Sequence, residues 1–510
     1  MNANLFARLT AGIADPKATA IETATGARIS YADLVARVGA MANALVGLGV
    51  RPGDRVAAQV EKSVEAIVLY LGTVRAGGVF LPLNTGYTAP EIAYFVGDAE
   101  PAVFVCDPAR IEALRPAAEA AGARLVTLDA RGEGTLMAAA RAAPAEFDTV
   151  EREADDLAAL LYTSGTTGRS KGAMLTHGNL VSNTLALRDV WRFTAEDVLI
   201  HALPIFHTHG LFVATNVTLF SGAAMIFLPK FDIDRVFELM PRATVLMGVP
   251  TFYVRLLGDD MLNAETTAHM RLFVSGSAPL LAETHRAWRA RTGHAILERY
   301  GMTETNMNTS NPYDGDRVAG TVGFPLPGVE IIVTDPETGR ELAEGEIGMI
   351  EVRGPNVFKG YWRMPEKTAA ELRANGFFVT GDLGRIDDRG YVHIVGRGKD
   401  LIITGGYNVY PKEIEAELDE IPGVVESAVI GVPHRDFGEG VTAVVVPAGA
   451  PVLDESSILK ELEARLARFK LPKRVLFVDE LPRNTMGKVQ KNVLRDRFAD
   501  LYGAVTTTSG

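Results

Sequence analysis

The segment with the clearest chemical potential is a loop rich in glycine and hydroxyl residues, YTSGTTGRSKG at 162–172, directly after the apolar run 157–161. Glycines let the backbone approach a ligand closely, and the N–H and hydroxyl groups can donate to phosphate oxygens. Arg169 and Lys171 add positive charge. Ser-Lys-Gly differs from the Gly-Lys-Ser/Thr order of the common nucleotide P-loop. We therefore predict a phosphate-binding loop of another type, with a surface Ser/Gly turn as the alternative.

Further polar residues follow strand-like runs or lie in turns. VSGSAPL (274–280), YGMTET (300–305) and FVTGDLG (378–384) each bring hydroxyls or a carboxylate to such a position. Near the C-terminus, Lys488 follows a glycine in PRNTMGKVQK. In open α/β sheets ligands gather at the carboxyl ends of the strands, so we expect these residues to surround one site.

The loop at 162–172, YGMTET, FVTGDLG, GRGKDLIITGGYNVYPKEIE and PRNTMGKVQK occur in this order over nearly the whole chain. Together they resemble the signature motifs of the adenylate-forming superfamily, which includes acyl-CoA synthetases, luciferases and peptide-synthetase adenylation domains. The resemblance implies an acid–thiol ligase that uses ATP and Mg²⁺ to form an acyl-adenylate, then transfers the acyl group to coenzyme A.

The same resemblance assigns roles to individual residues. Thr303 contacts the α-phosphate, Glu304 helps to hold Mg²⁺, and Asp382 accepts hydrogen bonds from the ribose hydroxyls. Arg397 lies beside the ribose and phosphate. The other implied nucleotide-binding positions are Thr163, Ser164, Gly165, Thr166, Thr167, Gly168, Lys171, Ser277, Ala278, Pro279, Tyr300 and Met302.

Lys488 matches the mobile catalytic lysine of the superfamily, which bridges the substrate carboxylate and the α-phosphate. Its acylation is a known control in relatives, so a lysine acetyltransferase and deacetylase are implied as partners. Lys399 matches the hinge about which the C-terminal domain rotates between the two half-reactions. Gly405, Gly406 and Tyr407 match the loop that lines the pantetheine tunnel after rotation.

The acid substrate depends on the pocket. FHTHGLF supplies His207 and His209, and ETHRAW supplies Arg286, which could pair with a second carboxylate on the substrate. An exposed helix charge is the alternative for Arg286. His207 could also gate the acyl pocket. With ILERYGMTET, these segments are similar to those of malonyl-CoA synthetases, which implies malonate as substrate and methylmalonate as a second one.

Elements that could position these residues alternate along the chain. Segments 31–46 and 64–76 show helical apolar periodicity, and short apolar runs ended by Gly, Pro or Ser separate them. This alternation predicts an α/β fold with helix-covered, largely parallel sheets. We expect an N-terminal domain at 1–396 that becomes β-rich from about 320, a small mobile α/β domain at 397–503, and a tail at 504–510.

The composition narrows the classes of protein to which the chain can belong. A net charge of −12 argues against a general nucleic-acid binder, and the one cysteine, Cys106, lies in a strand-like run and suits a reducing cytosol. Residues 210–229 are free of charge but hold polar residues and Ser-Gly, so we expect buried helix, turn and strand rather than a membrane span. The alternatives are a ligase for another small acyl or aryl acid, a luciferase, a peptide-synthetase domain, or a non-catalytic nucleotide-binding regulator.

Overall fold

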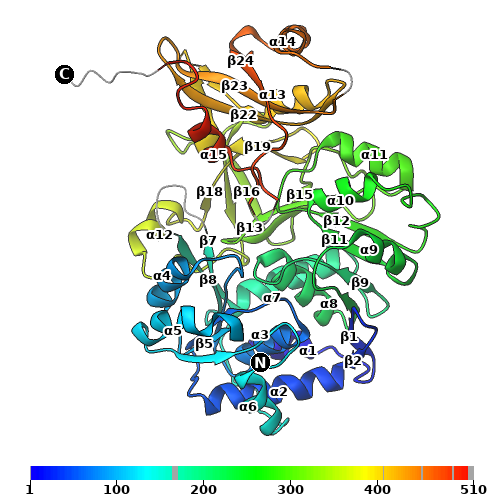
Figure 1. Cartoon of the computed structure of the whole chain (residues 1–510), viewed down its shortest axis with the longest axis vertical. Helices are drawn as coiled ribbons and strands as arrows, with labels where there is room; N and C mark the ends of the chain where they lie inside the picture. Colours follow the sequence, from blue (N-terminus) through cyan, green and yellow to red (C-terminus); the bar gives the residue numbers. More distant parts are fainter. Residues whose placement is uncertain (1, 164–169, 406, 450–451, 485–486, 504–510) are drawn as a thin grey trace.

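A computed structural model describes residues 2–163, 170–405, 407–449, 452–484 and 487–503. Two large sheets, with helices around them, form most of the N-terminal domain (Figure 1). A four-stranded antiparallel sheet joins them, and a separate sheet forms the C-terminal domain at one end of the molecule. The expected α/β fold class is confirmed.

The six-stranded sheet has the order β6-β5-β3-β4-β7-β8 and is parallel except for the β7–β8 pair. Its strands are β3 (Arg55–Gln59), β4 (Val79–Pro82), β5 (Val103–Cys106), β6 (Arg124–Thr127), β7 (Leu157–Thr163) and β8 (Lys171–Thr176). Cys106 is completely buried at the end of β5, and burial raises the pKa of its thiol to about 11.

The nine-stranded sheet has the order β15-β14-β13-β12-β11-β9-β10-β1-β2, and its five central strands, β13 to β10, are parallel. Its strands are β1 (Thr19–Thr23), β2 (Arg28–Ser30), β9 (Val198–His201), β10 (Ala224–Phe227), β11 (Val245–Gly248), β12 (Leu272–Ser275), β13 (Leu297–Met302), β14 (Asn306–Ser310) and β15 (Phe324–Pro325).

The helices of the N-terminal domain cover these sheets. They are α1 (Leu5–Thr10), α2 (Tyr31–Gly47), α3 (Val64–Arg75), α4 (Ala89–Ala99), α5 (Ile111–Ala120), α6 (Thr135–Ala142), α7 (His177–Val190), α8 (Asn216–Phe220), α9 (Ile233–Leu239), α10 (Pro250–Leu257), α11 (Ala282–Thr292) and α12 (Pro365–Glu371). The predicted helices at 31–46 and 64–76 are α2 and α3. A capping box of Ser30 and Asp33 starts α2, because each side chain accepts from the other residue's backbone N–H.

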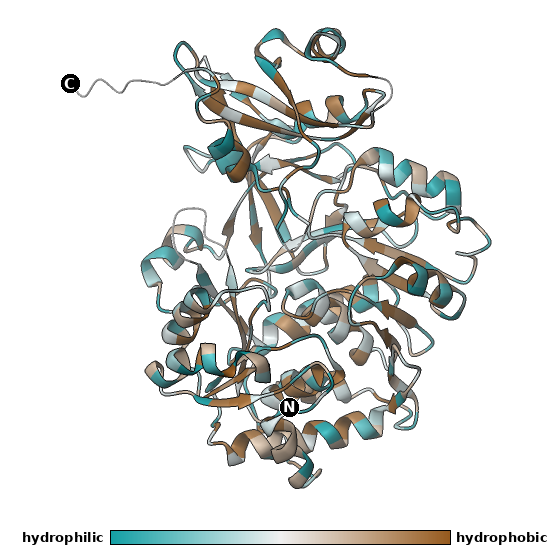
Figure 2. Ribbon diagram, viewed as in Figure 1, coloured by the Kyte–Doolittle hydropathy of each residue, from teal (hydrophilic) through white to brown (hydrophobic). Residues whose placement is uncertain are grey.

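The segment at 210–229 forms the end of a π-helix, α8, a turn and β10, as expected from its polar residues. No helix within the described part of the chain is long and apolar enough to cross a bilayer. Hydrophobic residues are concentrated in the strands between the helical layers (Figure 2).

The β-rich region after 320 is an antiparallel sheet of β16 (Glu330–Thr334), β17 (Gly348–Arg353), β18 (Phe378–Ile386) and β19 (Val392–Arg397). A single turn, Gly398–Asp400, leads from β19 into the C-terminal domain. That domain consists of β20 (Ile402–Thr404), β21 (Tyr407–Val409), β22 (Val424–His434), β23 (Gly438–Pro447) and β24 (Arg474–Phe477), with α13 (Pro411–Asp419), α14 (Glu455–Glu463) and α15 (Lys491–Arg497).

Candidate active site

The site lies where the parallel strands of the nine-stranded sheet end. Because β9, β11, β12 and β13 are parallel, the segments that follow them meet at one edge. Partly exposed Ser277 and Ala278 and exposed Pro279 follow β12. Met302 ends β13, and Thr303 begins the turn to β14; both are partly exposed.

The middle of the site is a hydrogen-bonded group of three predicted residues. Tyr300 donates its hydroxyl to Asp382 Oδ2 at 2.5 Å, and Arg397 Nε pairs with Asp382 Oδ1 at 2.8 Å. Asp382 raises the pKa of Arg397, which therefore stays charged. Burial and the Asp382 carboxylate hold the pKa of Tyr300 well above its ordinary value. The motifs at 300–305 and 378–384 thus meet through side chains from β13, β18 and β19.

Glu304 is buried in the turn between β13 and β14. Its Oε1 accepts from Thr163 Oγ1 at 3.4 Å and from Tyr361 Oη at 3.0 Å, and burial raises its pKa. Thr163 ends β7, which pairs antiparallel with β8, so the glycine-rich motif contacts Glu304 through Thr163. Ser164, Gly165, Thr166, Thr167 and Gly168 lie outside the described residues.

Lys488 comes to this site from the C-terminal domain. Its backbone N–H donates to Asn484 Oδ1 at 3.0 Å, and Asn484 N–H donates to the Lys488 carbonyl at 2.9 Å. A Cβ added to Gly487 would lie 3.4 Å from Thr251 of α10, so the chain next to Lys488 reaches the N-terminal domain. Desolvation and repulsion by Arg397 lower the pKa of the Lys488 ammonium, while Asp382 and Glu304 attract it.

His207 and His209 lie in the segment after β9, His209 at the start of the π-helix His209–Thr215. Ser277 Oγ and His209 Nδ1 are 3.2 Å apart, which links this segment to the end of β12. Burial and the nearby Lys488 lower the pKa of His207 to about 4, so its ring is neutral near pH 7. Burial also keeps the pKa of His209 well below its ordinary value.

Arg299 on β13 is a site residue that the sequence analysis missed. It is 3% exposed, and its Nε and Nη2 have no hydrogen-bond partner among the described residues. The glycine at 276 permits this packing, because a Cβ there would lie 2.4 Å from the Arg299 guanidinium carbon. Burial lowers the Arg299 pKa to about 9, so it remains charged near pH 7. The neighbouring Glu298 does not neutralise it, because burial raises the Glu298 pKa to about 8.

A second unpartnered polar atom lies close to Arg299. His209 Nε2 is buried without a partner among the described residues, and the Arg299 charge further lowers the His209 pKa. Unpartnered buried donors are costly unless a ligand satisfies them. The geometry therefore favours an anionic group of a ligand beside Arg299 and His209.

Arg286 does not lie with these residues. The buried side chains of α11 are Thr284, His285, Trp288 and Thr292, and Arg286 is on the opposite, exposed face. Its side chain is 56% exposed and pairs with Glu420 at the end of α13. Arg286 therefore does not bind the substrate as expected but forms an ion pair between the two domains. The helical period of α11 places its side chain on the outer face of the helix.

This placement predicts that Arg286→Leu changes kcat/KM for the acid by no more than about fivefold, since exposed ion pairs contribute about 0–1 kcal/mol. The measurement is pyrophosphate release against acid concentration at saturating ATP. A tenfold or larger loss with unchanged KM for ATP would return Arg286 to the acid pocket.

The predicted hinge and tunnel residues belong to the C-terminal domain. Lys399 lies in the turn Gly398–Asp400, and the adjacent Asp400 pairs with Arg495 of α15. Gly405 has a φ of +57° and donates its N–H to the Phe437 carbonyl, and the exposed Tyr407 ring stacks on Phe469. Gly406 lies outside the described residues.

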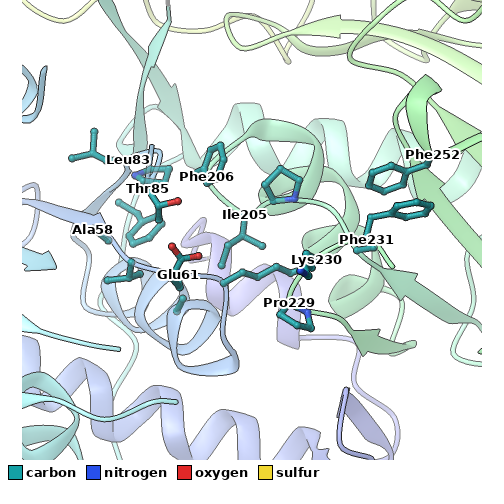
Figure 3. Close-up of a pocket in the computed structure, with 17 residues that line it drawn as sticks. Ala58, Glu61, Leu83, Thr85, Ile205, Phe206, Pro229, Lys230, Phe231 and Phe252 are labelled. Atoms are coloured by element: carbon teal, nitrogen blue, oxygen red, sulfur yellow. The ribbon is translucent and has the colours of Figure 1, made fainter. Parts of the chain in front are cut away.

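A cavity of about 230 Å³ is lined in part by the segment before His207. Figure 3 shows Ile205 and Phe206 on one of its walls and Phe231 and Phe252 on another. Glu61, Lys62 and Lys230 add charge to a lining that is otherwise mostly apolar. An apolar arm of a ligand would suit this lining.

Known proteins resemble this chain in both sequence and structure. The family described as AMP-binding enzyme matches residues 11–362, and the AMP-binding enzyme C-terminal domain matches residues 413–488. The ATP-bound structure of MatB from Rhodopseudomonas palustris is 69% identical, with a TM-score of 0.97 over 98% of this chain and 100% of that one. The apo structure of MatB has the same identity and coverage with a TM-score of 0.87.

Curated relatives act on different acids. The malonate–CoA ligase of Arabidopsis thaliana is 36% identical over 88% of this chain and 79% of its own length. A feruloyl-CoA synthase of an Amycolatopsis species is 38% identical over 95% and 96%. Both family matches together cover most of the residues, and Tyr300, Asp382 and Arg397, from three of the motifs, meet through their side chains. The chain belongs to the AMP-binding enzyme family of ATP-dependent, adenylate-forming CoA ligases.

Proposed function

We propose that the chain is a malonate–CoA ligase, which converts malonate, ATP and CoA to malonyl-CoA, AMP and pyrophosphate, with methylmalonate as a second substrate. The observation that carries the acid assignment is the buried Arg299 guanidinium, which lies beside His209 and has two nitrogens without a hydrogen-bond partner in the described part of the chain. A monocarboxylic acid would leave this charge unsatisfied, whereas a short diacid supplies a second carboxylate. The likeness to MatB and to curated malonate–CoA ligases supports the same assignment.

In the first half-reaction, Asp382 accepts from the ribose hydroxyls while Tyr300 and Arg397 hold its carboxylate in place. Glu304 would supply one carboxylate for Mg²⁺, which proteins commonly hold through one or two carboxylates and the substrate phosphates. The described residues contain no group of three or more His, Cys, Asp or Glu side chains that could hold a metal alone. This donor set fits Mg²⁺ that arrives with ATP and neutralises phosphate charge.

Lys488 then assists the attack of one malonate oxygen on the α-phosphorus, from which pyrophosphate departs. Both reactants are anionic, and a cation between them lowers their repulsion and stabilises the transition state. Arg299 holds the other carboxylate of malonate, and the neutral His207 adds no competing charge near pH 7. Thr303 and Lys171 contact the phosphates, and Ser277, Ala278, Pro279 and Met302 border the base and acyl group.

In the second half-reaction, the CoA sulfur attacks the acyl carbonyl carbon, the bond to the adenylate oxygen breaks, and AMP leaves. The cavity lined by Phe206 suits the pantetheine arm, with the exposed Lys230 at its edge for the anionic end of CoA. Lys62 instead donates to the His201 carbonyl at 2.8 Å. Rotation of the C-terminal domain about Lys399 would withdraw Lys488 and bring Gly405, Gly406 and Tyr407 to the arm. A hinge at Lys399 also supports a boundary near residue 397 between the N-terminal and C-terminal domains.

Lys399→Pro tests the hinge. Proline fixes φ, so the turn Gly398–Asp400 should lose the freedom that rotation needs. We expect adenylation to be retained and thioester formation to slow by about tenfold or more. Single-turnover assays separate the two: pyrophosphate release for the first, and malonyl-CoA formation from supplied malonyl-adenylate for the second. Equal losses in both steps would contradict a hinge role.

The proposed function is tested by pyrophosphate release with ATP and Mg²⁺ over malonate, methylmalonate, succinate, acetate, octanoate and a cinnamate, each with and without CoA. We expect strong release with malonate and methylmalonate, and malonyl-CoA formation from malonate when CoA is present. Preference for a monocarboxylic acid would overturn the diacid assignment and favour another acyl- or aryl-CoA ligase. ATP binding without turnover of any acid would favour a regulator. Acetylation of Lys488 would stop the first step by removing its charge.

A further inference from the structure

A second polar cluster adjoins the site and contains two residues that the mechanism above does not use. Glu371, the last residue of α12, accepts from Tyr361 Oη at 2.6 Å and pairs with Lys367 Nζ at 2.6 Å. It also pairs with Lys171 Nζ at 3.3 Å. Lys171 is thus joined to a helix that lies 200 residues further along the sequence.

Tyr361 connects this cluster to Glu304. Its hydroxyl is 3.0 Å from Glu304 Oε1 and 2.6 Å from Glu371 Oε2, and the Lys171 ammonium lies 4.2 Å from the centre of its ring. One tyrosine therefore contacts both the lysine of the phosphate loop and the carboxylate proposed for Mg²⁺. A cation over an aromatic ring is attracted by the electrons of its face.

The cluster is enclosed and charged. Tyr361 is 2% exposed, and the side chains of Lys171 and Glu371 are 12% and 22% exposed. Burial alone would raise the pKa of Glu371, but hydrogen bonds from Lys367 and Tyr361 and the Lys171 charge outweigh it and lower the pKa. Glu371 therefore carries a negative charge that holds the Lys171 ammonium on the Tyr361 ring.

We propose that Glu371 and Tyr361 are positioning residues that hold the Lys171 ammonium beside the phosphate site before ATP binds. This inference rests on the proposed function. A free lysine side chain loses rotamer freedom when it binds a phosphate, and a lysine already held in place loses less. The contacts of 3.3 and 3.4 Å from Lys171 to Glu371 are long for a charge-assisted pair, so a phosphate oxygen can compete for the ammonium.

Glu371→Ala is the direct test, with Glu366→Ala as its matched control because Glu366 is exposed in the first turn of the same helix. Titration calorimetry with Mg²⁺ and ATP, without malonate, should give a Kd about tenfold higher for Glu371→Ala, the size expected when a free lysine side chain must be ordered on binding. The control should match the wild type. In steady-state assays KM for ATP should rise while KM for malonate stays unchanged.

Two conservative variants keep the test informative if Glu371→Ala folds poorly. Glu371→Gln retains acceptors for Tyr361 and Lys171, so its ATP Kd should lie between those of Glu371→Ala and the wild type. Tyr361→Phe keeps the ring under Lys171 and should also bind ATP more weakly. Wild-type ATP affinity in Glu371→Ala or Tyr361→Phe, or equal rises in KM for ATP and malonate, would overturn the inference. Failure of the wild type to bind ATP would instead overturn the proposed function.

Discussion

Lys488→Ala is expected to lower the rate of malonyl-adenylate formation by at least about 10³-fold, the size of effect seen when a preorganised cation is removed from a phosphoryl-transfer site. The reason is electrostatic: Lys488 is the cation that the C-terminal domain brings to the site, where Asp382 and Glu304 attract it. Malonate–ATP-dependent pyrophosphate release in single turnover measures the step. Lys460→Ala, an exposed lysine on α14, is the control and should retain full activity.

The second half-reaction distinguishes a chemical role for Lys488 from a structural one. When malonyl-adenylate is supplied with CoA, Lys488→Ala should still form malonyl-CoA, because the charge repulsion that Lys488 relieves belongs to the first step only. Equal loss of thioester formation would show that the substitution disturbs the domain as a whole.

Arg299→Leu is expected to lower kcat/KM for malonate by at least about 10²-fold and to leave the Kd for ATP unchanged. A site built to hydrogen-bond one substrate group discriminates strongly once that bond is lost. The leucine should also allow propionate or butyrate to be adenylated, because the charge that rejects an apolar chain is gone. The measurements are pyrophosphate release over these acids and ATP titration. Arg286→Leu makes the same chemical change outside the site and serves as the matched control.

Stability supplies an independent check on Arg299. Two nitrogens of the buried Arg299 guanidinium have no partner among the residues that the structure describes. Such a group costs free energy in the absence of substrate, so Arg299→Leu should have an unfolding temperature equal to or above that of the wild type. A marked drop in unfolding temperature together with lost activity would indicate that Arg299 maintains the fold rather than binding the acid.

Much of the architecture could be predicted from local patterns. Apolar periodicity identified α2 and α3, and the short apolar runs ended by Gly, Pro or Ser became strands of the two large sheets. The resemblance of the five motifs to those of the adenylate-forming superfamily implied that Tyr300, Asp382 and Arg397 surround one nucleotide, and the structure joins these three side chains. Residues in tight turns or at strand ends are predictable in this way because their backbone geometry restricts the residue type.

The acid pocket was harder to predict than the fold, because the burial of a charged side chain depends on contacts between distant elements. Arg286 was expected in the pocket, yet the period of α11 places it opposite Trp288 and toward Glu420. Arg299 was missed, although its spacing of two from Leu297 puts both side chains on one face of a strand. An arginine sharing a strand face with a buried leucine was the available signal. The contacts of Glu371 with Lys171 and Tyr361 had no local signal at all.

The complete burial of Cys106, with its thiol pKa raised to about 11, leaves the chain without an accessible, reactive native thiol. A cysteine introduced on the exposed face of α11 and another on α14 would therefore be the two sites that a maleimide dye labels. Energy transfer between dyes at these sites would report the distance between the domains in single molecules. The rotation between the half-reactions could then be timed directly, without first replacing any residue of the native sequence.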